Sequence, residues 1–278
     1  MESGFSTMQY SDIDWNRIWQ ESRRKKSWKK KQSSDWDKRA SSFAQRNINS
    51  GYVDSFLALM QPQKDWSVLD VGCGPGTLAL PLASQVKSIT GIDFSHAMLS
   101  ELQSRVDQED IANIHPVEAS WTDDWDMLSI PRHDVAISSR SLAVHDLQAA
   151  LLKLNEYAKK KVFIADKVGS GPFDPDLFAS LGRPFDSGPD YIITVNLLYQ
   201  MGIQAKIDYI ELEQAKVFVS REEAVDASRW MLEDLTPDEE KKIEVYVDER
   251  LCRTEDGHWL FRRRAPVKWA FISWDKKH

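Results

Sequence analysis

Three closely spaced glycines are the residues of this 278-residue chain that most clearly predict chemistry. Gly72, Gly74 and Gly76 directly follow the apolar run 68–71, which contains a single acid, Asp70. Glycine suits a turn that brings its backbone close to a ligand, because it has no Cβ and adopts positive φ readily. A helix that begins after such a turn aims its free N–H groups at the ligand. The stretch therefore predicts a strand, a ligand-binding turn and a helix.

A second acid, Asp93, ends another β-rich run at residues 88–93. An acid at the tip of the second strand of a doubly wound sheet accepts hydrogen bonds from ribose hydroxyls, so a nucleotide-like ligand is expected. Nicotinamide and flavin folds use Gly-x-Gly-x-x-Gly, which counted from Gly72 would place Thr77 at a position that favours Gly or Ala. The spacing argues against those cofactors.

Asp70 followed by Gly-x-Gly-x-Gly resembles the first motif of the class I S-adenosylmethionine-dependent methyltransferases of the small-molecule type. The resemblance continues through residues 91–95, Met98, 117–121 and 134–138, and covers roughly residues 66–168. It implies an α/β fold with a doubly wound, Rossmann-like, mostly parallel sheet and a final antiparallel strand. It also implies S-adenosylmethionine as cofactor, and a last pair of strands that forms an antiparallel hairpin at one sheet edge.

The resemblance also implies which residues contact the cofactor. Asp70 would support the glycine turn and reach the amino group, Asp93 would hold the ribose hydroxyls, and Phe94 would pack near the adenine with Met98. Ser120 departs from the acid that the family often has there, and Glu118 or Asp123 could take its place. The full set of cofactor-binding positions is Trp36, Asp70, Gly72, Cys73, Gly74, Asp93, Phe94, Met98, Ser120, Trp121 and Ser138.

Two residues after the fourth expected strand are the candidates for catalysis, although in-line methyl transfer depends mainly on positioning. Arg140 would lie beneath the methyl group and bind an anionic substrate, or else form a surface ion pair. His145 has the location of a general base, and imidazole exchanges protons near neutral pH, but next to a helix-capping Asp146 it could equally be structural. Asp166 and Lys167, at the end of the fifth strand, are further candidates for substrate contact.

Apolar runs that alternate with helical patterns predict how these residues are positioned. Strands are expected at 67–71, 88–92, 114–118, 134–138 and 161–165, with helices that include 97–107 and 147–159 between them. This alternation is typical of a parallel sheet with its ligand at the carboxyl ends of the strands. Further elements are expected at 215–219 and 267–274 (strands) and at 221–232 and 236–250 (helices).

The domain organisation follows from the segments that flank this pattern. Residues 1–60 are expected to be a helical N-terminal lid in which Trp36 shares a face with Ala40 and Phe43, or else an ordinary helix packed on the sheet. Residues 61–278 would form the methyltransferase domain, with the turn-rich segment 169–210 as an inserted substrate cap that includes a helix near 191–202. Asp12 or Asp14 would cap a first helix.

Composition limits the remaining possibilities. The net charge of −7 argues against a dedicated nucleic-acid binder, although the run Arg23–Lys31 has seven cations in nine residues. That run is either a solvated connector or a patch that contacts phosphate or RNA. Two cysteines indicate neither a disulfide framework nor a zinc site, and no metal is expected. Without an apolar run of membrane length or the pattern of a signal peptide, a cytoplasmic location is expected.

The sequence therefore predicts a methyltransferase that acts on a small molecule. An RNA or protein methyltransferase is a second hypothesis, for which Arg23–Lys31 and Arg262 to Arg264 are the basic tracts. A cofactor-binding regulator without catalysis is a third, because a fold and a cofactor site do not fix a reaction. The acceptor atom and the oligomeric state stay open.

Overall fold

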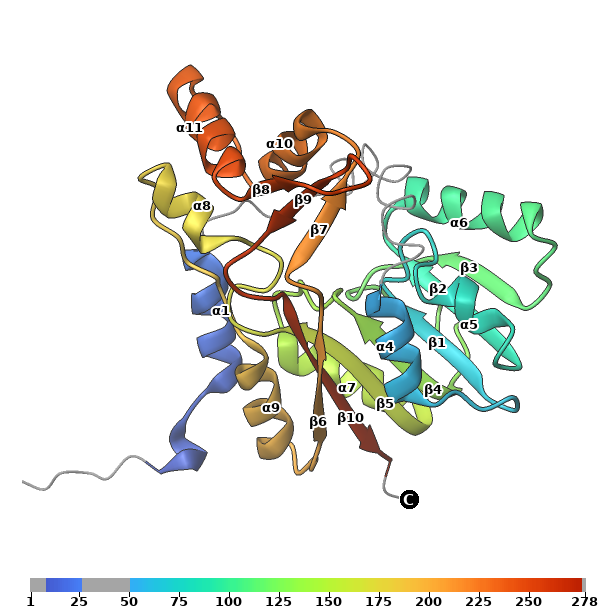
Figure 1. Ribbon diagram of the computed structural model, residues 1–278. Helices are drawn as coiled ribbons and strands as arrows, with labels where there is room; N and C mark the ends of the chain where they lie inside the picture. Colours follow the sequence, from blue (N-terminus) through green and yellow to red (C-terminus); the bar gives the residue numbers. More distant parts are fainter. Residues whose placement is uncertain (1–8, 27–50, 277–278) are drawn as a thin grey trace, which may run out of the picture.

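A seven-stranded mixed sheet forms the centre of the computed structural model, which describes residues 9–26 and 51–276 (Figure 1). The strand order is β3-β2-β1-β4-β5-β10-β6. Strands β1 to β5 are parallel, and β10 is antiparallel to both of its neighbours, β5 and β6. This confirms the predicted fold class. The strand bounds are β1 Ser67–Val71, β2 Ser88–Asp93, β3 Ile114–Glu118, β4 His133–Ser139, β5 Ala158–Lys167, β6 Lys206–Glu211 and β10 Lys268–Asp275.

Helices cover both faces of this sheet, because its central strands are apolar on both sides. In β1, Val68 faces one apolar cluster while Leu69 and Val71 face the other, and all three are buried. This is the pattern expected of a parallel sheet with two covered faces. The first cluster takes α4 (Gly51–Met60), α5 (Ala79–Ala83) and α6 (His96–Gln108), and the second takes α1 (Trp15–Lys25), α7 (Leu147–Tyr157) and α9 (Tyr191–Gln200).

Helix α1 follows the short 3-10 helix η1 (Tyr10–Asp12) and begins where Asp14 caps it by accepting a hydrogen bond from the Arg17 backbone N–H. Trp19 is 2% exposed, and its indole Nε1 donates to the carbonyl of Val144 at 2.9 Å. Arg23 is partly buried and donates to the neighbouring Ala143 carbonyl at 2.9 Å. The first cation of the basic run is therefore not a solvated connector, because it anchors α1 to the segment after β4. Residues 27–31 of the run lie outside the described residues.

A smaller unit lies at the carboxyl ends of the parallel strands, at the top of Figure 1. Its antiparallel sheet has the order β7-β9-β8 (Ala215–Phe218, Trp259–Arg262 and Leu251–Arg253). Helices α8 (Pro175–Ser180), α10 (Arg221–Arg229) and α11 (Pro237–Asp248) pack on it around a core that includes Phe178, Ile243 and Phe261. We call residues 212–267 the inserted unit, since they connect β6 to β10.

The expected final hairpin of the strands at 215–219 and 267–274 is not present, because β10 pairs instead with β6, an edge strand that was not predicted. β10 and β6 are antiparallel neighbours with β6 at the sheet edge, and the inserted unit replaces the turn between them. The expected cap at 169–210 is divided, because residues 191–211 form α9 and β6 of the main domain. Only residues 169–190 of that segment stay at the carboxyl edge. The expected strand at 215–219 exists, but in the small sheet.

Candidate functional site

The glycine turn has the backbone shape that its sequence predicts. The φ angles of Gly72 and Gly74 are +74° and +55°, and the Gly72 N–H donates to the Ile92 carbonyl at 2.8 Å. A Cβ on Gly72 would lie 2.4 Å from Cβ of Ser141, whereas a Cβ on Gly74 would meet no atom within 4 Å. The turn is therefore tightly supported at Gly72 and open at Gly74.

Asp93 ties this turn to the end of β2. The side chain is 8% exposed, and its Oδ2 accepts a hydrogen bond from the Gly74 N–H at 2.9 Å while Oδ1 accepts from the Ser95 N–H at 2.9 Å. Ser95 in turn caps α6 by accepting from the Met98 N–H. Phe94 is 44% exposed beside Asp93, and Met98 is buried behind it. The acid predicted for ribose binding thus stands at the junction of the two turns.

Asp70 carries a buried carboxylate oxygen without a partner. The side chain is 2% exposed, and Oδ2 accepts no hydrogen bond from any described residue. Burial, together with the nearby Asp93 carboxylate, raises the pKa of Asp70 to about 7. An unpaired buried carboxylate is unfavourable unless a ligand supplies a donor or a positive charge. The turn therefore suits a ligand with a cationic donor group.

The loop after β3 holds the two residues predicted to lie near an adenine ring. The Ser120 N–H donates to Asp123 Oδ2 at 2.8 Å, which lowers the pKa of Asp123, and Ser120 Oγ lies 3.0 Å from Thr122 Oγ1. The ring of Trp121 packs 6.0 Å from that of Trp125. Asp123, the alternative to Ser120 as an adenine contact, therefore stabilises this loop by accepting the Ser120 N–H.

The end of β4 is tied to the glycine turn through serine hydroxyls. Ser138 is fully buried, with its Oγ 2.7 Å from Ser141 Oγ, and Ser141 donates to the Val71 carbonyl at 2.6 Å. Ser139 Oγ lies 2.6 Å from the hydroxyl of Tyr52 on α4. Sequence reasoning missed Ser141 and Tyr52. The serine-rich run 138–141 was the signal available for the first, and nothing local pointed to the second.

Arg140 and His145 occupy different environments, although both follow β4. The φ of Arg140 is +59°, its N–H donates to the Ala165 carbonyl at 2.9 Å, and its guanidinium carbon lies 4.2 Å from the ring centre of Tyr52. Burial lowers the pKa of Arg140. His145 is exposed, immediately before Asp146, which caps α7 as predicted. Of the two, only Arg140 is enclosed by other elements.

The end of β5 brings further charged groups to the same edge. Asp166 accepts from Thr194 Oγ1 on α9 and from the Lys167 N–H, both at 2.8 Å. Burial raises the pKa of Asp166 and lowers that of Lys167, whose Nζ donates to the Gly169 carbonyl at 3.1 Å. The Arg23 guanidinium on α1 interacts electrostatically with Asp166. A basic-run residue thus reaches the edge where substrate contact was expected.

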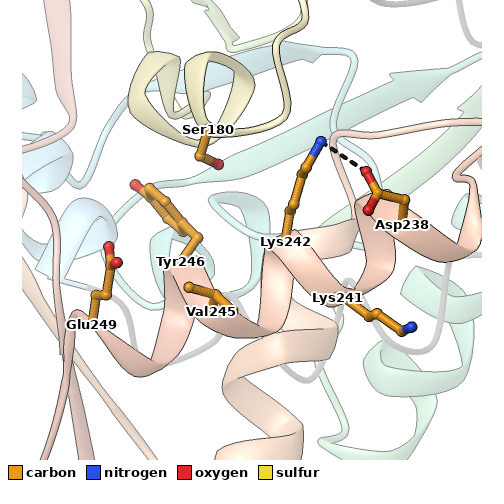
Figure 2. Close-up of a pocket in the computed structure, with 7 residues that line it drawn as sticks. All are labelled: Ser180, Asp238, Lys241, Lys242, Val245, Tyr246 and Glu249. Atoms are coloured by element: carbon orange, nitrogen blue, oxygen red, sulfur yellow. Dashed lines mark ion pairs between the residues drawn. The ribbon is translucent and has the colours of Figure 1, made fainter.

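Two surface hollows lie outside this edge. One, of about 330 Å³, is lined by α11 and by Ser180 of α8, and Figure 2 shows the ion pair of Lys242 with Asp238 at its rim. The other, of about 790 Å³, is lined by Arg262 to Arg264 and by neighbouring residues. Neither includes a residue of the glycine turn.

Two further predicted residues, Trp36 and Cys73, differ in whether the described part of the chain includes them. Trp36 lies outside it. Cys73 is buried inside the turn and is a free thiol, and burial raises its pKa. Within residues 9–26 and 51–276 no group of three acidic, histidine or cysteine side chains could hold a metal ion, and no helix is long and apolar enough to cross a membrane.

Comparison with known proteins gives the family. Residues 68–161 match the family described as "Methyltransferase domain". An uncharacterized protein of Haemophilus influenzae is 34% identical over 244 residues, which are 86% of this chain and 88% of that protein. The crystal structure of the YcgJ protein from Bacillus subtilis matches with a TM-score of 0.56 at 14% identity, over 82% of this chain and 98% of that one, and so shows the fold. The chain belongs to the class I S-adenosylmethionine-dependent methyltransferases.

One further similarity covers only a short stretch. A 23S rRNA (uracil(1939)-C(5))-methyltransferase, RlmD, of Aliivibrio fischeri is 31% identical over 75 residues. These residues are 27% of this chain and 17% of that protein. The protein is thus a methyltransferase that uses S-adenosylmethionine, while the nature of its acceptor is a separate question.

Proposed function

We propose that this enzyme transfers the methyl group of S-adenosylmethionine to a small-molecule acceptor. The observation that carries the proposal is the partial burial of the charged side chains at the ends of β4 and β5. Arg140, Asp166 and Lys167 are all partly buried, instead of forming an open basic surface. A polymeric RNA acceptor is bound mainly through exposed cations that contact its phosphates, so this edge is better suited to a small acceptor.

The residues present fit the cofactor. In the proposal, the unpartnered Oδ2 of Asp70 accepts from the α-amino group, and the open side of Gly74 allows close approach of the methionine portion. Asp93 binds the ribose hydroxyls, since its carboxylate stands where the two turns meet and each carboxylate oxygen can accept more than one hydrogen bond. The other proposed contacts are Gly72, Cys73 and Ser138 at the turn, Phe94, Met98, Ser120 and Trp121 around the adenine, and Trp36.

The bound cofactor supplies an electrophilic methyl group on a sulfonium. The contribution of the chain is to hold the acceptor in line with that group, which is where most of the rate enhancement of such a displacement arises. Arg140 is proposed to bind the acceptor at the end of β4. His145 is proposed to accept a proton from it, and its exposure lets the proton pass to water.

An RNA acceptor is the second candidate, and the basic tract Arg262 to Arg264 is its described support. Arg263 is engaged internally, because it donates to the Pro172 and Phe173 carbonyls and pairs with Asp174 at 3.5 Å. Only Arg262 and Arg264 of the tract are exposed. We also propose a cytoplasmic setting, which the two free cysteines, Cys73 and Cys252, support.

Methyl-labelled S-adenosylmethionine and a cell extract test the proposal. Products are separated by size and by sensitivity to nuclease and protease. We expect label in the small-molecule fraction with the wild-type enzyme and none with Asp93→Ala. Asp107→Ala, which removes an exposed acid on α6, is the matched control and should retain labelling. Label found only in RNA or in protein would overturn the small-molecule proposal.

A further inference from the structure

Arg140 is held on an aromatic platform at the acceptor side of the sheet. Its guanidinium carbon lies 4.2 Å from the ring centre of Tyr52 and 5.8 Å from that of Trp269. The two rings are themselves in edge contact, with centroids 6.1 Å apart. The φ of +59° places Arg140 in the left-handed region, which is strained for a residue with a long side chain. The fold thus keeps a cation in one fixed position at the expense of backbone strain.

Some hydrogen-bond donors of this platform have no acceptor among the described residues. Among residues 9–26 and 51–276, no carboxylate or carbonyl is recorded as an acceptor for the Arg140 guanidinium. Trp269 is 8% exposed, and its Nε1 is buried without a hydrogen-bond partner in the same part of the chain. The Tyr52 hydroxyl is already engaged with Ser139. A guanidinium whose carbon lies 5.8 Å from the centre of an indole ring with an unpaired N–H suits a planar group that accepts hydrogen bonds and carries one negative charge, which describes a carboxylate.

Within this platform, Trp269 lies furthest from the glycine turn, whereas Arg140 follows β4, the neighbour of β1, and Tyr52 interacts electrostatically with Asp70. The glycine turn, Asp93 and Ser120 follow β1, β2 and β3, whereas Arg140 follows β4 and Trp269 lies near the start of β10, beyond β5. Neighbouring strands are about 4.8 Å apart, so β10 lies roughly 14 Å from β1. A guanidinium on this side of a sulfonium is also repelled by it, unless an anion lies with them. The position of Trp269 favours a carboxylate of the acceptor, and the decarboxylated analogue described below tests the carboxylate of the cofactor as the other source.

We propose that Arg140 and the Trp269 indole N–H bind a carboxylate of the acceptor, so that the substrate is a small carboxylic acid. The proposal rests on the proposed function, because it names the class of small molecule that is methylated. It also accounts for an arginine held half-buried against aromatic rings at this edge.

Fractionation of the acceptor tests the proposal directly. A small-molecule extract is passed over an anion exchanger at pH 7, then eluted at pH 2 and finally with concentrated salt. At pH 2 carboxylates are protonated and released, whereas phosphate and sulfate esters stay charged. Each neutralised fraction is incubated with enzyme and labelled cofactor, and we expect acceptor activity in the pH 2 eluate. Activity in the flow-through or only in the salt eluate would overturn the carboxylate assignment and leave the small-molecule proposal intact.

Matched variants locate the subsite. With the active fraction, Arg140→Met should raise the acceptor concentration needed for half-maximal labelling by roughly 10- to 100-fold, and Trp269→Phe, which keeps a ring but removes the donor, by roughly 10-fold. The affinity for S-adenosylhomocysteine should stay within about twofold, which also reports folding. Arg132→Met is the control, because Arg132 lies 4.8 Å from the Tyr157 ring but is paired with Asp126 and Glu156.

The same variants distinguish the two possible sources of a carboxylate. S-adenosylmethionine also carries one, and its decarboxylated analogue serves as the probe. If wild type binds the analogue much more weakly and Arg140→Met abolishes that difference, the subsite binds the cofactor and the proposal is overturned. An equal preference in wild type and Arg140→Met, with the acceptor effect above, supports it.

Discussion

The carboxyl edge of the main sheet and the inserted unit differ in how their arginines and buried polar groups are partnered. At the edge, Asp70 Oδ2 and Trp269 Nε1 are buried without described partners, and Arg140 has a strained backbone. In the inserted unit, the buried and half-buried arginines are paired, as in Arg221 with Asp248 and Arg229 with Glu240. Unsatisfied groups are unfavourable in the free protein, so where they persist a ligand is the expected partner. We therefore expect the carboxyl edge to bind the ligands and the inserted unit to support the fold around them.

The inserted unit is held mainly by its apolar core. Ile243 and Phe261 of the unit are nearly fully buried together with Phe178 of α8, which packs on it. Most of the ion pairs of the unit lie at the surface, where such pairs contribute little. Two pairs differ, because Arg263 with Asp174 and Arg183 with Glu239 connect the segment before α9 to this unit. Arg183 is bidentate to Glu239 and also donates to the Glu233 carbonyl. The unit is thus attached to the segment before α9 by ion pairs as well as by the apolar packing of α8.

Substitutions in the glycine turn should have the largest effect. Gly72→Ala places a methyl group 2.4 Å from Cβ of Ser141 at a φ of +74°, so we expect the free energy of unfolding to fall by about 2–4 kcal/mol. Binding of S-adenosylhomocysteine should weaken more than about 100-fold. Thermal unfolding and calorimetric titration measure the two effects.

Gly74→Ala is the matched variant, because its methyl group meets no protein atom within 4 Å. We expect it to lose only about 1 kcal/mol of stability, from the strain of its positive φ. Binding of S-adenosylhomocysteine should nevertheless weaken at least about 10-fold, because the methyl group occupies the open side of the turn. Wild-type affinity in Gly74→Ala would contradict the assignment of this side to the cofactor.

The pKa of Asp70 predicts a pH dependence of cofactor binding. Since this pKa is raised to about 7, the free enzyme holds a proton that a cationic amino group displaces. The dissociation constant of S-adenosylhomocysteine should therefore rise by up to about 10-fold for each unit by which the pH drops below 7. Above pH 7 it should be constant. Asp70→Asn should bind more weakly at pH 8 and lose this slope, and an unchanged slope in the variant would assign the proton to another group.

Ligand-free stability should show the opposite trend for the same residue. An unfolded aspartate has a pKa of about 3.9, so between about pH 4 and pH 7 the folded chain binds more protons at Asp70 than the unfolded chain does. The contribution of Asp70 to stability is thus present at low pH and is lost as the pH rises through 7. The difference between wild type and Asp70→Asn in urea unfolding at several pH values measures this contribution.

Local sequence patterns were sufficient to predict those parts of the site whose structure depends on residues close together in the chain. The glycine turn, the strands before it and after it, and the caps Asp14 and Asp146 are each specified within a few positions, and the structure contains all of them. The edge strand β6 was missed, because it lacks the alternating burial that indicates a strand, and its partner among the described residues, β10, follows after the whole inserted unit.

The platform around Arg140 could not be predicted for a related reason. Tyr52 comes from α4 and Trp269 from β10, so their meeting depends on the packing of elements far apart in the chain. The contact of Arg23 with the Ala143 carbonyl could not be predicted either, because the sequence does not distinguish Arg23 from the other cations of its run. Sequence patterns specify elements and turns, whereas the surroundings of Arg140, the proposed acceptor side, are made by tertiary contacts.

Removal of the Arg183 contacts should affect the inserted unit and leave the cofactor turn unchanged. Arg183→Met breaks its bond to the Glu233 carbonyl and its pair with Glu239, and we expect a loss of about 1–2 kcal/mol in stability. Limited proteolysis should cut the inserted unit faster, while the affinity for S-adenosylhomocysteine stays within about twofold. A large loss of cofactor affinity would show that the two regions are coupled, against the separation argued above.

The two cysteines allow the carboxyl edge and the inserted unit to be compared by thiol reactivity, with the smallest expected effect on stability and binding. Cys252 is exposed on the inserted unit, whereas Cys73 is buried in the glycine turn, where burial and the nearby Asp70 carboxylate raise its pKa. Because the thiolate is the reactive form, a thiol reagent at pH 8 should modify Cys252 quickly and Cys73 only after unfolding. Cys252→Ser should therefore show no fast reaction and should keep wild-type cofactor affinity. A fast reaction of that variant would mean that the turn opens readily without ligand, and the edge would then be a flexible binding region instead of a preformed one.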